Sequence, residues 1–362
     1  MAQAAHPPAG PTGEPGGAVP SGEPGGPAAP RSGPSRWRLV GRRLLALREG
    51  SIVVITLVTA VYFSLNTSAF LTGENFKTLL PYFAPFAILA AGEVFVMILG
   101  EIDLSIAAMY LFAPILFYKL NTSLGLPLVP AVIGALLVCM CVGAVNGVFV
   151  AVVGINSFVA TLGMLFTFEG LSLIISKGTP VATPGGQPPL ATFGKVFGGG
   201  TYSELIWALA IVALLQVVLT FSRWGLYTVA IGSNKLAAGE AGVRVSLVTI
   251  RNFVLCSLTA ALVGIFEAVR SATVQPNPAG PNEILFLAVA AAVIGGTLLT
   301  GGSGTVVGAL IGALFLGILK DGLILQGVQA NYLLFYTGLA VIVAMAANVY
   351  VGRARRGGDW SG

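Results

Sequence analysis

Two carboxylates interrupt the apolar sequence at Gly100–Ser105, which contains Gly-Glu-Ile-Asp-Leu-Ser. A carboxylate in the middle of a hydrocarbon layer costs about 2.5 to 3.5 kcal/mol, so it belongs at a helix end, in a cavity or beside donors. Glu101, Asp103 and Ser105 are therefore candidates to line a path for a polar solute. The structural alternative is that Asp103 or Ser105 caps the following helix, and the two roles are compatible.

Amide and hydroxyl side chains interrupt two further apolar segments. Asn146 precedes Gly147, and Asn156, Ser157 and Thr161 lie within Ile155–Gly163. Such groups in apolar helices more often form hydrogen bonds between helices than line a path. Both roles remain open for these four residues.

A polar segment at Gly232–Val243 contains a short run of small and apolar residues. Ser233 or Asn234 can cap the start of a helix, and Gly242 can end it. A two-turn helix of this composition suits insertion into a groove of a partner protein. The alternative is an ordinary helix in an interfacial loop.

Glycines dominate Gly295–Gly304 and recur at Gly308 and Gly312. The spacing Gly304, Gly308, Gly312 predicts a smooth stripe on one helix face for close packing, and Gly301–Gly304 allows a tight reversal. A phosphate-binding loop is the alternative, but the pattern G-x-x-x-x-G-K-[ST] does not occur in the chain. We therefore expect this chain not to bind ATP itself.

The elements that carry these segments are membrane-spanning helices. Charged residues form 9% of the 362 residues, whereas soluble proteins have about 25%. This composition argues against a water-soluble globule, a nucleic-acid-binding protein and a disordered scaffold. The fold class predicted is an all-α integral membrane protein.

Because a crossing needs roughly 20 mostly apolar residues, the sequence predicts about ten spans. The third and ninth are only about 15 residues long, which suggests half-helices or tilted helices there. The spans are Ser51–Leu71, Tyr82–Leu99, Leu104–Lys119, Val129–Val152, Phe158–Ile175, Glu204–Phe221, Asn252–Val269, Ile284–Leu299, Thr305–Leu319 and Asn331–Val351.

The basic residues predict the orientation of these spans. Arginines precede the first span between Arg36 and Arg48 and follow the last one at Arg353, Arg355 and Arg356, which places both termini in the cytoplasm. The loop 222–251 holds four basic residues and is also cytoplasmic. In this orientation 13 of the 19 basic residues lie inside.

Four regions follow from these patterns. A Pro/Gly-rich disordered tail (1–35) and a basic juxtamembrane segment (36–50) precede a permease domain (51–352), and a basic tail (353–362) follows it. The three cysteines lie in apolar runs and are expected to be buried, and the one histidine is His6 in the tail. No metal site is expected.

Taken together, the four segments resemble the permease subunits of bacterial ATP-binding-cassette (ABC) importers for ribose, xylose and related simple sugars. The resemblance covers about Leu80 to Val351. The family patterns G-[GE]-I-D-L-S, N-G-x-x-V-A, P-F-[IV]-A-T-L-G, G-x-N-x-x-A-A-x-x-x-G and V-I-G-G-T-x-x-x-G-G-x-G resemble Gly100–Ser105, Asn146–Ala151, Phe158–Gly163, Gly232–Gly242 and Val293–Gly304.

The resemblance implies a transport subunit in the bacterial plasma (inner) membrane, with no catalytic residue and no cofactor or metal of its own. It implies a cytoplasmic ATPase that binds ATP and Mg, an extracytoplasmic sugar-binding protein that delivers a pentose or hexose, and a second permease copy, identical or a close paralogue. Lys235–Ala241 would be the coupling helix, and the outer loops Gly178–Tyr202 and Ser271–Glu283 would receive the binding protein. The residues implied in coupling are Gly232, Asn234, Lys235, Ala237, Ala238, Glu240 and Gly242.

The chain departs from the family pattern in places that bear on the sugar. Many members have Gly where this chain has Glu101, a variant that resembles the xylose-type branch, and Ala107–Ala108 replaces a usual Gly-Ser. Many relatives also carry an Asp soon after the residues that correspond to Glu283–Leu285, and this chain has none. No particular sugar is assigned.

Two other classes of protein remain alternatives. A proton-coupled carrier of a small polar solute could use carboxylates as proton sites, but it gives no role to the loop helix. A membrane-embedded enzyme lacks a nucleophile and base that we can place. The carboxylates available to a carrier are Glu93, Glu101, Asp103, Glu169 and Glu267.

Overall fold

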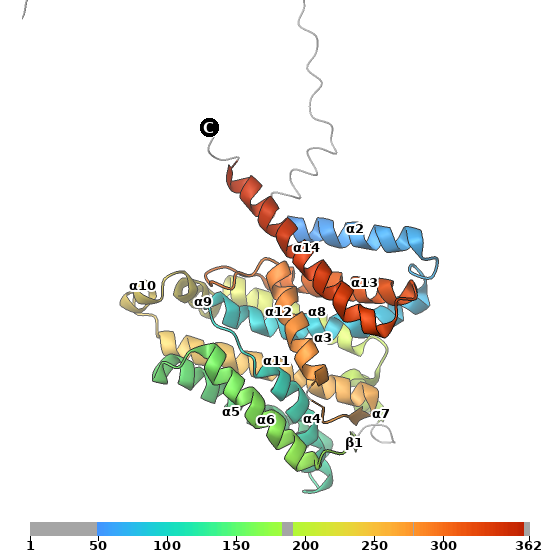
Figure 1. Cartoon of the computed structure of the whole chain (residues 1–362). Coiled ribbons are helices and arrows are strands. Elements are labelled where there is room, and N and C mark those ends of the chain that lie inside the picture. Colours follow the sequence, from blue (N-terminus) through green and yellow to red (C-terminus); the bar gives the residue numbers. More distant parts are fainter. Residues whose placement is uncertain (1–48, 183–190, 278, 358–362) are drawn as a thin grey trace, which may run out of the picture. The chain divides into compact units, whose positions relative to one another are not determined.

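The structure is a computed structural model that describes residues 49–182, 191–277 and 279–357. The predicted tail (1–35), most of the juxtamembrane segment (36–48) and the end of the C-terminal tail (358–362) lie outside the described residues. The permease domain predicted over 51–352 is largely described, and its helices are shown in Figure 1.

In the described part of the chain, ten apolar helices correspond to the ten predicted spans. Seven of them are long and apolar enough to cross a membrane, and three are shorter. The helices are α2 (Gly50–Asn66), α3 (Gly73–Ile98), α4 (Ile106–Thr122), α5 (Leu128–Val148, extended by the π-helical turn Phe149–Val153), α6 (Ser157–Ser176), α8 (Ser203–Phe221), α11 (Val245–Ser271), α12 (Ala279–Ile294), α13 (Val306–Leu325) and α14 (Ala330–Gly357).

The short helices are not all where the sequence placed them. The third span is short, as predicted, with 17 residues, but the ninth, α13, has 20 residues and the eighth, α12, has 16. Helix α12 ends at Ile294 because Gly296 adopts a positive φ of 96°. Helix α13 continues past Leu319 because Lys320 and Asp321 have partners, at 3.4 Å from Glu283 and 2.8 Å from Asn75.

The predicted cytoplasmic loop (222–251) is more helical than expected. Besides the predicted short helix α10 (Lys235–Glu240), it contains α9 (Arg223–Ser233). Helix α11 begins at Val245, seven residues before the predicted start at Asn252. The polar residues in the first turns of α11 predict a loop. They are compatible with a helix because they lie at its end, where side chains such as Ser246 are exposed.

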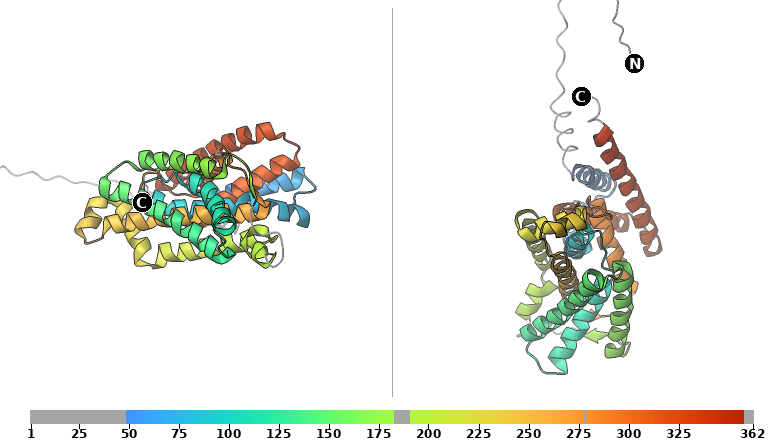
Figure 2. Two further views of the ribbon diagram at one scale, coloured as in Figure 1. Left: turned by 90° about the horizontal axis from the view of Figure 1, so that it is seen from below. Right: turned by 90° about the vertical axis from the view of Figure 1, so that its left-hand side faces the viewer.

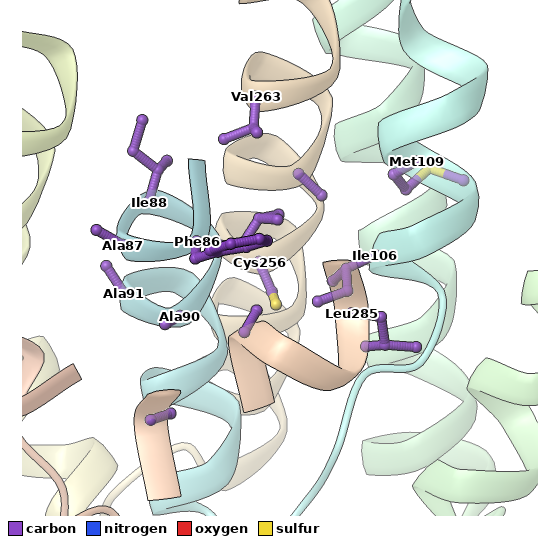
Figure 3. Close-up of a cluster of buried hydrophobic side chains, with 14 of the residues drawn as sticks. Phe86, Ala87, Ile88, Ala90, Ala91, Ile106, Met109, Cys256, Val263 and Leu285 are labelled. Atoms are coloured by element: carbon purple, nitrogen blue, oxygen red, sulfur yellow. The ribbon is translucent and has the colours of Figure 1, made fainter. Parts of the chain in front are cut away.

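Helices α3 and α11 form the centre of the bundle. The most apolar windows of these two helices are 89% and 78% buried, whereas that of α14 is 11% buried. Side chains from α3, α4, α11 and α12 meet in one apolar cluster that includes Phe86, Ile106, Cys256 and Leu285 (Figure 3). A contiguous core therefore surrounds α3.

The predicted glycine stripe packs α13 closely against α12. A Cβ atom at Gly308 would lie 2.0 Å from the carbonyl oxygen of Gly295, and one at Gly312 would lie 2.1 Å from that of Ala291. No side chain fits at either position, so the two backbones approach each other directly. The spacing predicted this packing for Gly308 and Gly312. Gly304 was wrongly included in the stripe, because it precedes the start of α13 at Val306 and its Cβ would meet the side chains of Ile98 and Thr297.

The two ends of the long helices carry different elements. Helices α9 and α10 lie at one end, and α7 (Ala191–Gly194) lies at the other (Figures 1 and 2). At the latter end the strands β1 (Val181–Ala182) and β2 (Thr273–Val274) pair antiparallel, with Val181 opposite Val274. The two loops predicted to face outward are thus joined to each other.

Candidate functional site

The first predicted motif is an unwound turn between α3 and α4. Gly100 adopts a positive φ of 80°, which ends α3, and helix α4 begins at Ile106. The backbone N–H groups of Ile102, Asp103 and Leu104 donate to Ser157 Oγ at 3.3 Å, Glu93 Oε1 at 3.1 Å and Thr161 Oγ1 at 3.1 Å. Side chains of α3 and α6 therefore satisfy three successive amides that no helix satisfies.

A buried polar network continues from this turn into α5. The Ser105 hydroxyl donates to Asp103 Oδ1 at 2.6 Å and accepts a hydrogen bond from Asn146 Nδ2 at 2.8 Å. Asp103, Ser105 and Asn146 have no exposed surface. Among the described atoms, Asp103 Oδ2 and Asn146 Oδ1 have no hydrogen-bond partner. The network fixes the turn and leaves two acceptor atoms in its interior.

Five of the seven predicted path residues meet at this turn. They are Asp103, Ser105, Asn146, Ser157 and Thr161. Glu101 lies on the turn and is half-buried. Asn156 is exposed and caps α6, accepting from the backbone N–H of Phe158 at 3.0 Å. These side chains form hydrogen bonds with backbone groups and with neighbouring side chains, which supports a role in positioning the turn.

Glu93 and Cys256 belong to the same network. Glu93 is fully buried, and its Oε2 accepts from Cys256 Sγ at 3.0 Å. The sequence pointed to Cys256 as a buried apolar residue and to Glu93 as a candidate proton site, but not to their contact. Cys139 is also buried, whereas Cys141 is exposed, in contrast to the expectation for all three cysteines.

The predicted coupling helix has the caps expected from its sequence. Asn234 Oδ1 accepts from the backbone N–H of Ala237 at 3.0 Å. At the other end Gly242 has a φ of 84°, and the N–H groups of Gly242 and Val243 donate to the carbonyl groups of Gly239 and Ala238, both at 3.0 Å. This pair of bonds is a Schellman motif, which ends the helix.

The side chains of α10 divide into two faces. Ala238 is buried and packs with Ile231 and Val248 of α9 and α11, so it faces the permease itself. Leu236 is 81% exposed, and Lys235, Ala237 and Glu240 are exposed as well. A partner protein would therefore meet Leu236 and its exposed neighbours, not Ala238.

Helix α9 lies directly on the end of α3. A Cβ atom at Gly232 would lie 1.7 Å from the carbonyl oxygen of Ile98 and 2.7 Å from the backbone nitrogen of Gly302. The same Ile98 oxygen accepts a hydrogen bond from Gly302 N at 2.8 Å. The predicted coupling segment (Gly232–Gly242), the end of α3 and the glycine-rich turn after α12 thus meet at one carbonyl group.

Asn252 of α11 joins α9 to α3 a second time. Its Oδ1 accepts from Trp224 Nε1 at 2.6 Å, and its Nδ2 donates to the carbonyl oxygen of Phe95 at 2.8 Å. Asn252 is completely buried. The sequence placed Asn252 only at the start of a span, because the contact joins residues 157 positions apart.

At the end of the bundle opposite α10, charged residues form a group that the motifs did not indicate. Arg270 donates to Glu267 and lies 3.4 Å from Glu204, and Lys320 lies 3.4 Å from Glu283. In the sequence, Arg270 and Lys320 served only to count charges on the two sides of the membrane. Isolated charges on different helices carry no spacing signal, so their association was not foreseeable.

Comparison with known proteins identifies the family. The family model for the permease component of branched-chain amino acid transport systems matches residues 75–345. The xylose/arabinose import permease of Sulfolobus acidocaldarius is 34% identical over 316 residues, which are 84% of this chain and 86% of that protein. The ribose import permease of Escherichia coli is 32% identical over 308 residues, 83% of this chain and 92% of that protein.

A third relative covers more of the chain. The L-arabinose ABC transporter permease of Azospirillum brasilense is 31% identical over 336 residues, which are 91% of this chain and 93% of that protein. No solved structure matches the chain. The chain belongs to this family of transport permease components. It is a multi-pass membrane subunit of an ABC transporter and not an enzyme, which confirms the resemblance seen in its four segments.

Proposed function

We propose that this chain is the permease of an ABC importer for a neutral monosaccharide, a pentose or a hexose. Its relatives are import permeases for ribose, xylose, arabinose and allose, and they match most of the chain. ATP and Mg would be bound by a separate cytoplasmic ATPase. An extracytoplasmic binding protein would deliver the sugar to the loops joined by β1 and β2.

The structural observation that supports ATP-driven coupling in this proposal is the contact of Gly232 with Ile98. A movement imposed on α10 from the cytoplasm would reach the end of α3 through α9, because Ala238 of α10 packs with Ile231 of α9, and α9 contacts the Ile98 carbonyl group backbone to backbone. Asn252 adds a second rigid connection to α3 and α11. The coupling helix therefore has a direct mechanical route into the buried core.

A second permease copy would complete the transport path. The apolar windows of α5, α6, α8 and α14 are between 11% and 33% buried within one chain. These faces offer surface both to lipid and to a second copy, identical or closely related. The proposal places the assembly in a bacterial plasma membrane with both termini in the cytoplasm.

The buried carboxylates support this proposal better than a proton-coupled carrier. Glu93 holds the Asp103 amide and the Cys256 thiol, and Asp103 holds the Ser105 amide and hydroxyl. Both carboxylates therefore stabilise the turn by accepting hydrogen bonds. A carrier, in addition, would give no role to the capped helix α10.

Substitution of Leu236 tests the coupling role. Leu236→Asp places a charge on the exposed apolar position of α10, and we expect sugar uptake to fall at least tenfold while the protein still reaches the membrane. Leu124→Asp is the matched control, since Leu124 is a 70% exposed leucine in the loop after α4, at the predicted outer side. Equal uptake by the two variants would contradict the coupling role.

A separate transport assay tests the energy source. In proteoliposomes with the complete importer, we expect uptake to be abolished by vanadate, which traps ABC ATPases, and to persist with an uncoupler. Uptake that is sensitive to the uncoupler and indifferent to vanadate would overturn the proposal in favour of the carrier.

A further inference from the structure

Two adjoining cavities lie at the end of the bundle opposite the coupling helix. Their volumes are about 330 and 440 Å³, which falls in the range of roughly 300 to 1,000 Å³ typical of small-molecule sites. Both are lined by Tyr110, Glu267 and Ile284, so they meet at these residues. The first is also lined by the polar residues Ser271, Thr273, Gln275 and Asn277 of the loop predicted to face outward.

The charged residues of the second cavity balance one another. Glu267 and Glu283 contribute two carboxylates, and Arg270 and Lys320 contribute two cations. Each cation has a carboxylate partner, Arg270 with Glu267 and Lys320 with Glu283. Glu204 lies behind Arg270 and lines neither of the two cavities. The charged side chains that line the cavity therefore carry no net charge.

Partly exposed ion pairs in a cavity suit a ligand with many hydroxyl groups. A hydroxyl donates to a carboxylate and accepts from a guanidinium or ammonium group, so each pair can hold one or two sugar hydroxyls through charge-assisted bonds. The side chains of Arg270 and Glu267 are 37% and 25% exposed, which leaves part of each for a ligand.

Aromatic residues supply the apolar contact that a sugar ring needs. Tyr82, Phe86 and Tyr110 line the second cavity, and Lys320 lies 5.6 Å above the ring of Tyr82. Phe86 also belongs to the apolar cluster of α3, α4, α11 and α12 (Figure 3). The cavity thus combines hydroxyl-binding charges with flat apolar faces.

We propose that these two cavities form a sugar-binding site within a single permease chain, selective for neutral monosaccharides over sugar acids and amino sugars. The inference rests on the proposed function and adds the residues that contact the sugar. The polar residues Ser271, Thr273, Gln275 and Asn277, from the loop that would receive the binding protein, provide the entrance. The site receives sugar at the outer side and holds it next to the apolar cluster.

Direct binding to the isolated full-length chain in lipid nanodiscs tests this site without an ATPase or a binding protein. Saturation-transfer NMR with D-xylose, D-ribose, L-arabinose and D-glucose measures weak binding to such a particle. We expect at least one neutral sugar to give a saturable signal. D-glucuronate and D-glucosamine, which carry a charge, are expected to bind at least fivefold more weakly than D-glucose.

Variants with matched controls assign the signal to the cavities. Glu267→Gln, Glu283→Gln and Tyr110→Ala are expected to raise the Kd for the neutral sugar about tenfold. Glu74→Gln and Tyr332→Ala are the controls, because Glu74 and Tyr332 are exposed residues at the same predicted side and line neither cavity. Melting temperatures in the nanodisc show whether each variant is folded, and the half-exposed Glu283 allows a variant with little risk to folding.

The outcomes separate this inference from the proposed function. Absence of a saturable signal, equal binding by cavity and control variants, or tighter binding of a charged analogue would each overturn the inference. Vanadate-sensitive sugar uptake alongside any of these results would leave the importer standing and remove only the site. If the wild-type importer shows no vanadate-sensitive sugar uptake, the proposed function itself is contradicted.

Discussion

Addition of one methyl group at Gly232 is expected to separate the coupling segment from the core. The Cβ of Gly232→Ala would lie 1.7 Å from the carbonyl oxygen of Ile98, whereas real Cβ contacts essentially never fall below 3.0 Å. Helix α9 must therefore move away from the end of α3 by about 1.3 Å, the difference between these distances. Neither contact atom can yield alone, because both the Ile98 oxygen and Gly302 N belong to the backbone.

The size of the effect follows from overpacking at this contact. Overpacked sites cost about 1 to 3 kcal/mol, while alanine stabilises a helix relative to glycine by about 1 kcal/mol. The higher helix propensity of alanine keeps α9 itself intact. The overpacking cost opposes only the docking of α9 on Ile98. A coupling energy reduced by about 1 to 3 kcal/mol corresponds to roughly 5- to 150-fold. We expect sugar uptake to fall within this range.

Gly239→Ala is the matched control for this experiment. Gly239 lies in α10, and the one neighbour that its Cβ would meet within 4 Å is Val245 Cγ2, at 3.9 Å, an ordinary van der Waals distance. This variant has the same chemical change in the same segment without the backbone clash. Uptake of radiolabelled sugar by cells with the complete importer, normalised to the permease in the membrane, gives the comparison.

Two results would refute the reasoning. If Gly232→Ala and Gly239→Ala transport equally well, the contact with Ile98 does not transmit the coupling. If the purified Gly232→Ala protein melts well below the wild-type temperature, the loss of uptake reflects reduced stability and not reduced coupling. The reasoning requires reduced uptake and reduced sugar-stimulated ATP hydrolysis in a protein that melts near the wild-type temperature.

Three further changes test the turn, the glycine stripe and the orientation. Asn146→Ala removes the donor to the buried Ser105 hydroxyl and should destabilise the protein by about 1 to 3 kcal/mol, measured as a lower melting temperature, whereas Cys141→Ala at an exposed position of the same helix should change little. Gly308→Leu should abolish folded permease in the membrane, because its Cβ would lie 2.0 Å from Gly295 O, whereas Gly338→Leu on α14, with nothing within 4 Å, should be tolerated. A membrane-impermeant maleimide should label Leu124→Cys in intact cells and Leu236→Cys only after permeabilisation; the opposite pattern would reverse the proposed orientation.

The sequence was sufficient for the helices because each span is a local property. Apolar runs near 20 residues long predicted ten spans, and the structure has an apolar helix for each. The errors lie in the loop 222–251, where α9 was not predicted, and at helix ends, where tertiary contacts decide. Helix α13 extends beyond Leu319 because Asp321 has Asn75 as a buried partner, and that bond joins residues 246 positions apart.

The same distinction applies to the candidate site. The caps of α10 at Asn234 and Gly242 could be predicted, because a helix cap involves neighbours within a few residues. The association of Ser157 with Ile102, or of Glu93 with Cys256, could not be predicted from residue types alone. Each motif was visible in the sequence, but their convergence on the end of α3 required the fold.

Helix α3 connects the three levels of the molecule. Phe86 lines the second cavity, Glu93 accepts a hydrogen bond from the amide of Asp103, and the carbonyl group of Ile98 contacts α9. Phe86 and Ile98 lie about 18 Å apart along the helix at 1.5 Å per residue. Helix α3 is buried along most of its length, and close-packed interiors transmit strain. A displacement of α9 at Ile98 would therefore reach Phe86 through a single helix, which links the proposed coupling segment to the proposed sugar site.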